Sequence, residues 1–142
     1  HELWKLELSG TKITDDGLRQ LAKLNKLEYL SLAQTQITDA GLEHLRALPR
    51  LHSLILLECK VEGPGIAWLE GLPELEYLDI QNTHIRDDHL RQVGKLKHLK
   101  HLSLGWLPLT DQGLKHLVGA PERAAKHSEL RIRDASDPAM LT

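Results

Sequence analysis

The chain has 142 residues, with 18 Lys and Arg against 20 Asp and Glu, and a formal net charge of −2. This length is typical of a single domain. Charges of both signs are interspersed, so no basic tract is present of the kind that neutralises nucleic-acid phosphates. No apolar run approaches the ~18 residues that a membrane-spanning helix needs. The single cysteine, Cys59, excludes an intrachain disulfide and is compatible with the cytoplasm. We therefore expect no nucleic-acid partner and no membrane span.

One pattern with a period of 24 residues repeats five times along the chain. The first half of each unit has leucines spaced as L-x-x-L-x-L, and this alternation predicts a short, half-buried strand. The second half places apolar residues three apart behind a Thr-Asp start, which predicts a short helix. A strand and a helix of this size cannot enclose a core, so the units must stack on one another. The units begin at Leu3, Leu27, Leu51, Leu75 and Leu99.

The second, helical halves of the units carry a specific motif. It reads I-T-D-D-G-L at 13–18, I-T-D-A-G-L at 37–42 and L-T-D-Q-G-L at 109–114. With this motif the chain resembles the leucine-rich repeat proteins from residue 3 to about residue 122. The resemblance implies an α/β fold: a right-handed solenoid with a parallel concave β-sheet and convex helices. The same subtype occurs in bacterial arrays and, with cysteine at the ladder position, in F-box-type ubiquitin ligase receptors. Here the ladder position, three residues after the third apolar residue of each L-x-x-L-x-L run, is mostly Thr, with only Cys59 as cysteine, and no F-box-like segment is present. The ladder residues are Thr11, Thr35, Cys59, Thr83 and Leu107.

The two ends of the array depart from the pattern. We expect residues 1–122 to form the array, and residues 123–142 to form a degenerate cap strand and a tail. Leu130 and Ile132 stand in the L-x-L relation four residues late, which predicts the sixth strand; the alternative is disorder after Pro121. No polar cap precedes Leu3, so we expect a piece of a longer array, able to self-associate through its uncapped first unit. The alternative is that unit one tolerates an exposed edge.

The helical halves also vary between units. Thr14 is the expected N-cap of the first helix, and Asp15 with its equivalents is interpreted as helix-start capping rather than as catalytic carboxylates. A glycine recurs early in each helix and predicts close packing between neighbours, with His89 replacing it in unit four. In unit three, residues 62–65 read Glu-Gly-Pro-Gly, which predicts a looser turn. The equivalents of Asp15 are Asp39, Asp87 and Asp111.

Strand alternation predicts which side chains project from the concave face. Apolar residues occupy positions where the pattern asks for polar ones, and aromatic residues flank them, which is typical of protein–protein hot spots. Two acidic residues would make the patch suit a partner with basic and apolar groups. The alternative is that a neighbouring domain covers the apolar pair Ile55 and Leu57. The candidate partner-binding residues are Tyr29, Ile55, Leu57, Glu58, Tyr77, Asp79, His101 and Trp106.

The sequence gives little support for a metal site or a catalytic site. The nine histidines lack metal-ligand spacing with cysteine partners, so we interpret them as solvated side chains and expect no metal or cofactor. Cys59 lies on the Thr ladder, which predicts a buried structural thiol rather than a nucleophile. No nucleophile elbow, zinc-protease motif or phosphate loop is present. We therefore expect no enzyme.

These observations predict a non-catalytic protein-recognition module that binds a protein partner on its concave face and forms part of a larger protein. Two alternatives remain open. The chain is a structural spacer within a longer repeat array, or it is the substrate-receptor part of a ubiquitin-ligase-like complex.

Overall fold

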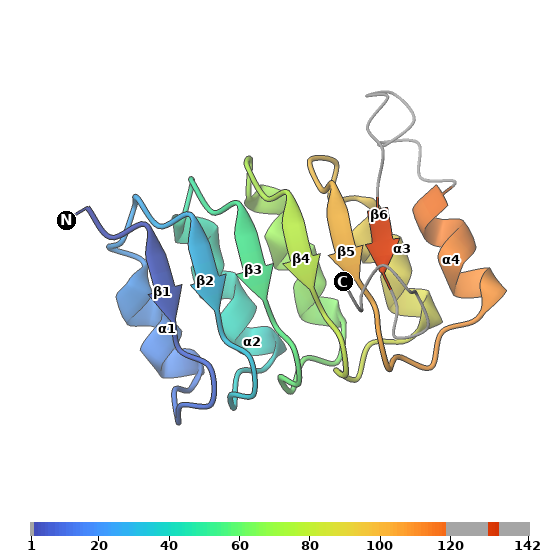
Figure 1. Ribbon diagram of the computed structural model, residues 1–142, viewed down its shortest axis with the longest axis horizontal. Helices are drawn as coiled ribbons and strands as arrows, with labels where there is room; N and C mark the ends of the chain where they lie inside the picture. Colours follow the sequence, from blue (N-terminus) through green and yellow to red (C-terminus); the bar gives the residue numbers. More distant parts are fainter. Residues whose placement is uncertain (1, 119–130, 134–142) are drawn as a thin grey trace.

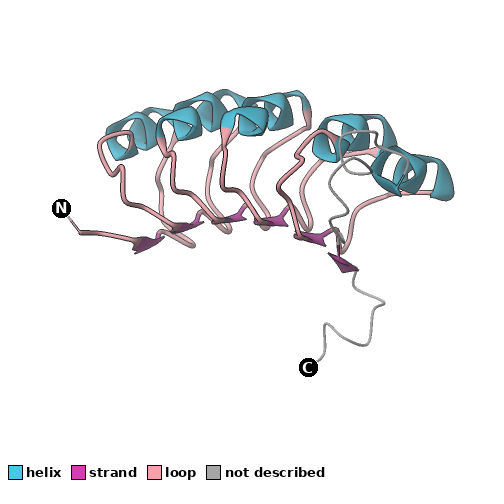
Figure 2. Cartoon of the chain, turned by 90° about the horizontal axis from the view of Figure 1, so that it is seen from above, coloured by secondary structure: helices cyan, strands magenta, loops and turns pink. Residues whose placement is uncertain are grey.

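The computed structural model describes residues 2–118 and 131–133. Within these residues, the strands form one six-stranded sheet in the order β1-β2-β3-β4-β5-β6, and every neighbouring pair is parallel. The strands line one side of a curved slab and the helices line the other (Figures 1 and 2). The elements in chain order are β1 (Lys5–Glu7), α1 (Asp15–Leu21), β2 (Tyr29–Ser31), α2 (Asp39–Leu42), η1 (Glu43–Ala47), β3 (Ser53–Ile55), η2 (Pro64–Gly71), β4 (Tyr77–Asp79), η3 (Asp87–His89), α3 (Leu90–Gly94), β5 (His101–Ser103), α4 (Asp111–Val118) and β6 (Arg131–Arg133).

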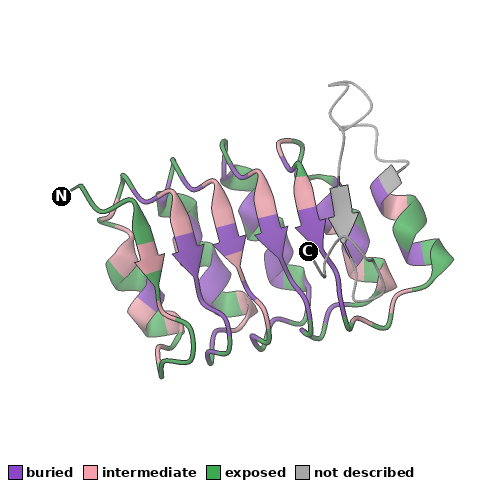
Figure 3. Cartoon of the chain, in the orientation of Figure 1, coloured by how far each residue is buried: buried purple, intermediate pink, exposed green. Residues whose placement is uncertain are grey.

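The leucine columns of the sequence become the layers of the core. Leu30, Leu54 and Leu78 are fully buried and pair in register across β2, β3 and β4. Unit one is covered on one side only, so Leu6, the equivalent of these three leucines, is only partly buried, and so is Leu8. The purple interior in Figure 3 accordingly runs through the middle units and thins toward β1. The predicted solenoid with a parallel concave sheet is confirmed.

Threonines close the turns after β1, β2 and β4. Thr11, Thr35 and Thr83 each donate a hydroxyl hydrogen bond to the carbonyl three residues earlier, at 2.6–2.8 Å. Cys59 replaces Thr in unit three, lies 3% exposed, and directs its thiol at the Leu32 carbonyl of the preceding unit (2.9 Å). Burial raises the pKa of this thiol, against the lowering effect of its contact with Thr35. The prediction of a buried structural cysteine is confirmed.

The helical halves follow their sequences closely. Units one and five carry α-helices of seven and eight residues, whereas η2 of unit three is entirely 3-10. Gly63 precedes η2 with φ of 136°, a conformation open to glycine, and Pro64 supplies its first residue. The expected departure of unit three is thus confirmed, although the irregular turn is itself helical.

The recurring Asp-Thr pairs act between units rather than as caps of their own helices. Thr14 stands at the N-cap of α1, but its side chain makes no capping hydrogen bond. Instead, Asp15 accepts hydrogen bonds from the Thr38 backbone N–H (2.9 Å) and hydroxyl (2.5 Å) of the next unit. Asp87 binds Thr110 in the same way, and Asp39 accepts the backbone N–H groups of 62 and 63. These carboxylates lie in the first helical turn, as predicted, but their hydrogen bonds run to the next unit and fasten each layer to the following one.

The recurring glycines make room for these carboxylates. A Cβ added at Gly41 would overlap the Asp15 carboxylate, and one added at Gly113 would overlap that of Asp87. In unit three, Gly63 stands where the aspartate is expected. The glycine that would make room for that aspartate, at position 89 of unit four, is missing too. His89 stands in its place, its ring fills the space beside Gly63, and its Nδ1 accepts the Arg86 backbone N–H (3.1 Å). The expected close packing is confirmed, and His89 does locally what an aspartate does elsewhere.

The sixth strand is present, but its register differs from the prediction. β6 pairs with β5 so that Ile132 lies opposite Leu102, a separation of 30 residues (132 − 102). The sequence interpretation placed Leu130 there instead. Successive residues of a strand alternate between faces, so a slip of two residues leaves the L-x-L pattern on the same face and the sequence cannot detect it. The predicted tail, residues 134–142, lies outside the described residues.

Candidate functional site

On the concave face, the first residues of successive strands lie side by side in register. Tyr29 and Tyr77 stand one strand to either side of Ser53, so their strands are about 10 Å apart. Each tyrosine has a partner on its far side: the Lys5 ammonium lies 4.8 Å from the Tyr29 ring centroid, and the rings of Tyr77 and His101 are 6.1 Å apart. Ser53, with its small side chain, therefore lies between two supported aromatic rings.

The aromatic rings are held in place by neighbouring polar groups. Tyr77 Oη and Ser103 Oγ are 3.5 Å apart, within hydrogen-bonding range. Burial raises the pKa of Tyr29, and its hydrogen bond with Glu7 raises the pKa further. The Tyr29 phenol therefore stays neutral at physiological pH. Such amphipathic rings, with a flat apolar body and a polar tip, are typical of interface anchors.

The apolar pair Ile55 and Leu57 lies beside these rings. Both side chains are half-buried, whereas Ser31 and Asp79, which pair with Ile55 on the neighbouring strands, are buried. The apolar pair, which was predicted to be exposed, is therefore only partly exposed. Together Ile55 and Leu57 form an apolar strip that continues the surface of the two tyrosines.

The prediction that Asp79 contributes an exposed negative charge was wrong. Its side chain is only 6% exposed, and its carboxylate accepts hydrogen bonds from the Gln81 backbone N–H (3.0 Å) and Nε2 (3.1 Å). Burial raises the pKa of this carboxyl, although both bonds from Gln81 oppose that shift. The acidic character of the rim therefore rests on Glu58, which is exposed and accepts a hydrogen bond from Gln34 Nε2 (3.1 Å).

Replacing Asp79 with Asn is expected to stabilise the protein at neutral pH. An asparagine at position 79 removes the buried charge, while its Oδ1 can still accept the Gln81 backbone N–H and its amide can donate to Gln81 Oε1 once the Gln81 amide turns over. The pKa of Asp79 is higher in the folded protein than in the unfolded chain. Its buried charge therefore lowers the stability above the folded pKa, and this cost vanishes below the unfolded pKa. Urea unfolding from acidic to neutral pH should show the advantage of D79N shrinking as the pH falls. An Asp16→Asn variant, at an exposed carboxylate, is the control for the chemical change itself.

The rim of the concave face has a left-handed backbone conformation that was not predicted from the sequence. Gln34, Glu58, Asn82 and Trp106 all have φ between 51° and 58°, in line with Gly10 at 71°. This left-handed turn is unfavourable for a bulky side chain. Trp106 adopts it and is nevertheless 67% exposed. In the sequence, only Gly10 and Asn82 indicate this left-handed turn, because glycine and asparagine favour such turns.

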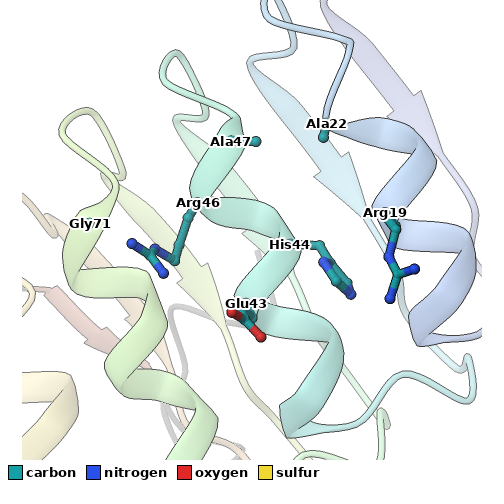
Figure 4. Close-up of a pocket in the computed structure, with 7 residues that line it drawn as sticks. All are labelled: Arg19, Ala22, Glu43, His44, Arg46, Ala47 and Gly71. Carbon is teal, nitrogen blue, oxygen red and sulfur yellow. The ribbon is translucent and has the colours of Figure 1, made fainter.

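A shallow hollow lies on the convex side, among the helices. Arg19 from α1 and His44 from η1 point into the same gap, while Arg46 points toward η2 (Figure 4). The Arg46 guanidinium lies 5.2 Å from the Trp68 ring centroid. The hollow is shallow and has a volume of about 500 Å³. Its lining residues are Arg19, Ala22, Glu43, His44, Arg46, Ala47 and Gly71.

The histidines do not converge on a metal-like arrangement in the part of the chain that the structure describes. No group of three or more His, Cys, Asp or Glu side chains there has metal-binding geometry. Over the same residues, no helix is long and apolar enough to cross a membrane.

Comparison with known proteins agrees with this geometry. A family model described as a leucine-rich repeat matches residues 3–22 and 23–45. The chain is a leucine-rich repeat protein. No curated protein matches it in sequence.

Among solved structures, this leucine-rich repeat chain is similar to two bacterial internalins of Listeria monocytogenes. An internalin (inlF) superposes with a TM-score of 0.70 at 25% identity, over 95% of this chain and 35% of that one. An internalin C2 (inlC2) superposes with a TM-score of 0.66 at 28% identity, over 98% of this chain and 57% of that one. The chain thus spans about a third and somewhat over half of these two proteins. The fold is one that serves as a protein-interaction repeat module.

Proposed function

We propose that this leucine-rich repeat chain is a non-catalytic recognition module that binds a protein partner on its concave face. The observation that carries the proposal is Trp106. Its left-handed backbone is unfavourable for a bulky residue, and its side chain is 67% exposed, so it contributes little to the core. A large aromatic side chain held at such a position is suited to burial against a partner.

The rest of the concave face supports the same role. Tyr29 and Tyr77 present flat rings on either side of the small Ser53 side chain. Ile55 and Leu57 continue the apolar strip, and Glu58 adds a negative charge at the rim. A partner with an apolar side chain flanked by basic groups fits this surface. Aromatic anchors beside aliphatic ones are the usual composition of an interface hot spot.

Affinity capture with two matched triple variants tests the proposal. The concave variant is Tyr29→Ala, Tyr77→Ala and Trp106→Ala. The convex control is Arg19→Ala, His44→Ala and Trp68→Ala, which also loses one tryptophan but alters the helix side. We expect a discrete protein to be captured by the wild type and the control, and to bind the concave variant at least about thirtyfold more weakly, the value of one hot spot of about 2 kcal/mol.

The opposite pattern would contradict the proposal. If the convex control loses the partner while the concave variant keeps it, binding belongs to the hollow around Arg46. Circular dichroism and urea unfolding of both variants establish that each retains the fold, because the replaced side chains are half-buried or exposed.

A further inference from the structure

Two tyrosine rings stand on either side of Ser53 on the concave face, and each ring is supported from its outer side. Tyr29 and Tyr77 pair in register with Ser53 across β2, β3 and β4, and all three residues are half-buried. The supporting groups, the Lys5 ammonium and the His101 ring, come from β1 and β5. The two rings therefore turn their other faces toward each other, above the small Ser53 side chain.

The distance between the two rings suits one flat group. The strands of Tyr29 and Tyr77 lie about 10 Å apart. The sheet lies on the inner side of the curved slab, so side chains that project from its strands converge toward one another (Figure 2). A planar group that packs about 3.5–4 Å from each ring takes up about 7–8 Å in total. One side chain with a flat end therefore fills the space above Ser53.

The charges around this space favour a cation. Burial is the main reason that the pKa of Tyr29 is raised, and the negative charges of Glu7 and Asp79 raise it further. Both carboxylates therefore act on the space beside this ring. Within residues 2–118, no Lys, Arg or His side chain forms an ion pair with either of them. The Tyr29 ring already stabilises one cation, because the Lys5 ammonium lies 4.8 Å from its centroid.

Among cationic side chains, arginine matches the space in shape. Its guanidinium is planar, stacks on aromatic rings and keeps its N–H donors in the plane, where the Ser53 hydroxyl can accept a hydrogen bond. A lysine ammonium is compact and strongly hydrated, so it is less suited to a gap between two rings. Ile55 follows Ser53 by two residues on the same face and is half-buried. It offers an apolar surface to the aliphatic stem of an arginine.

We propose that the space between Tyr29 and Tyr77 binds an arginine side chain of the protein partner, with its guanidinium stacked between the two rings above Ser53. This inference rests on the proposed concave-face function and names the chemistry of one side chain that this face takes. An aromatic or aliphatic side chain would fill the same space but would leave Glu7 and Asp79 without a counter-charge. The arginine thus supplies both the flat shape and the positive charge that the space calls for.

An NMR titration with N-acetyl-arginine amide tests the proposal without knowledge of the partner. Tyr29 and Tyr77 are the two tyrosines of a chain without Phe, so their ring signals can be followed individually. We titrate up to about 100 mM, because two ring contacts on one side chain support binding in the millimolar range. The citrulline analogue has the same shape without the charge, and we expect the arginine probe to bind at least about tenfold more tightly. Absence of a saturable shift at both rings, or equal binding of citrulline, would overturn the proposal.

A variant that fills the space locates the binding site. Ser53→Leu leaves both tyrosines in place but occupies the gap between them, and it should weaken binding of the arginine probe at least about tenfold. Gln36→Leu adds the same side chain at an exposed position outside the strands and should change nothing. Urea unfolding shows that both variants keep the fold, and the citrulline comparison does not depend on either variant. Undiminished binding to S53L would place the arginine elsewhere and would contradict the proposal.

The captured partner separates this inference from the proposed function. We expect S53L to bind that partner at least about tenfold more weakly than the wild type does. If the variant with Tyr29→Ala, Tyr77→Ala and Trp106→Ala loses the partner while S53L holds it like the wild type, the concave face binds without an arginine between the rings. The arginine inference alone then fails. If the triple variant also holds the partner, both proposals fail.

Discussion

Replacing Leu54 with alanine is expected to lower the free energy of unfolding by about 2–5 kcal/mol, the range for a fully buried leucine. Leu54 is 0% exposed and sits in β3, with a paired strand on each side. The layers on either side cannot close the resulting cavity without breaking register, because each layer is fastened to the next by the Asp15 and Asp39 carboxylates. Urea unfolding in dilute solution measures the change.

Leu6→Ala is the matched control for this substitution. Leu6 occupies the same position of unit one, but it is only partly buried, since only one side of its layer is covered. Its truncation should cost well under half of the Leu54 effect. Equal losses at both positions would contradict the description of unit one as an open terminal layer.

Gly63→Asp is expected to destabilise the protein by about 1–3 kcal/mol, although aspartate is the regular residue at this point of the repeat. An added Cβ would overlap the His89 ring, and φ at this position is 136°, which aspartate adopts only with strain. The loss should disappear in a triple variant that also carries Pro64→Ala and His89→Gly. There the new aspartate can begin a helix, because it no longer precedes a proline that keeps it out of the helical region.

The triple variant is expected to regain stability because its new aspartate can form the hydrogen bond that joins neighbouring units. In the triple variant the aspartate introduced at position 63 can accept the Arg86 backbone N–H, as Asp15 accepts that of Thr38, and a glycine at position 89 leaves room for its carboxylate. His89→Gly alone should cost up to about 1.5 kcal/mol, because it removes the side chain that accepts that N–H. Urea unfolding of the three variants measures these differences. A triple variant no more stable than G63D would show that units three and four are joined in some other way.

The period, register and layering could be predicted from the sequence because they depend on leucines at fixed spacing. The departure of unit three was visible in the Gly-Pro-Gly run, whose effect is local. The role of Asp15 was not predicted, since it depends on how far apart two units lie. A signal was nonetheless present: the aspartate is absent at 63 and the glycine is absent at 89, two positions that lie against each other in neighbouring units.

For the candidate site, the sequence indicated which side chains project from the concave face, but not how deeply each of them is buried. Alternation along a strand says that Asp79 points to the concave side, but not that neighbouring side chains bury it to 6% exposure. The left-handed rim was missed because Gln34, Glu58 and Trp106 are residues that rarely adopt such a turn. Backbone strain at Trp106 is visible only in the folded chain, and it is the observation on which the proposed function depends.

The most direct test of concave-face binding uses the chain's own three tryptophans as reporters. Trp106 marks the concave rim, Trp68 the helix side and Trp4 the β1 edge, and all three are exposed. Hydroxyl-radical labelling of the chain, with and without its captured partner, reads the three faces in one experiment. We expect labelling of Trp106, Tyr29 and Tyr77 to fall several-fold on binding while that of Trp68 is unchanged. Protection of Trp68 with Trp106 still fully labelled would contradict binding on the concave face.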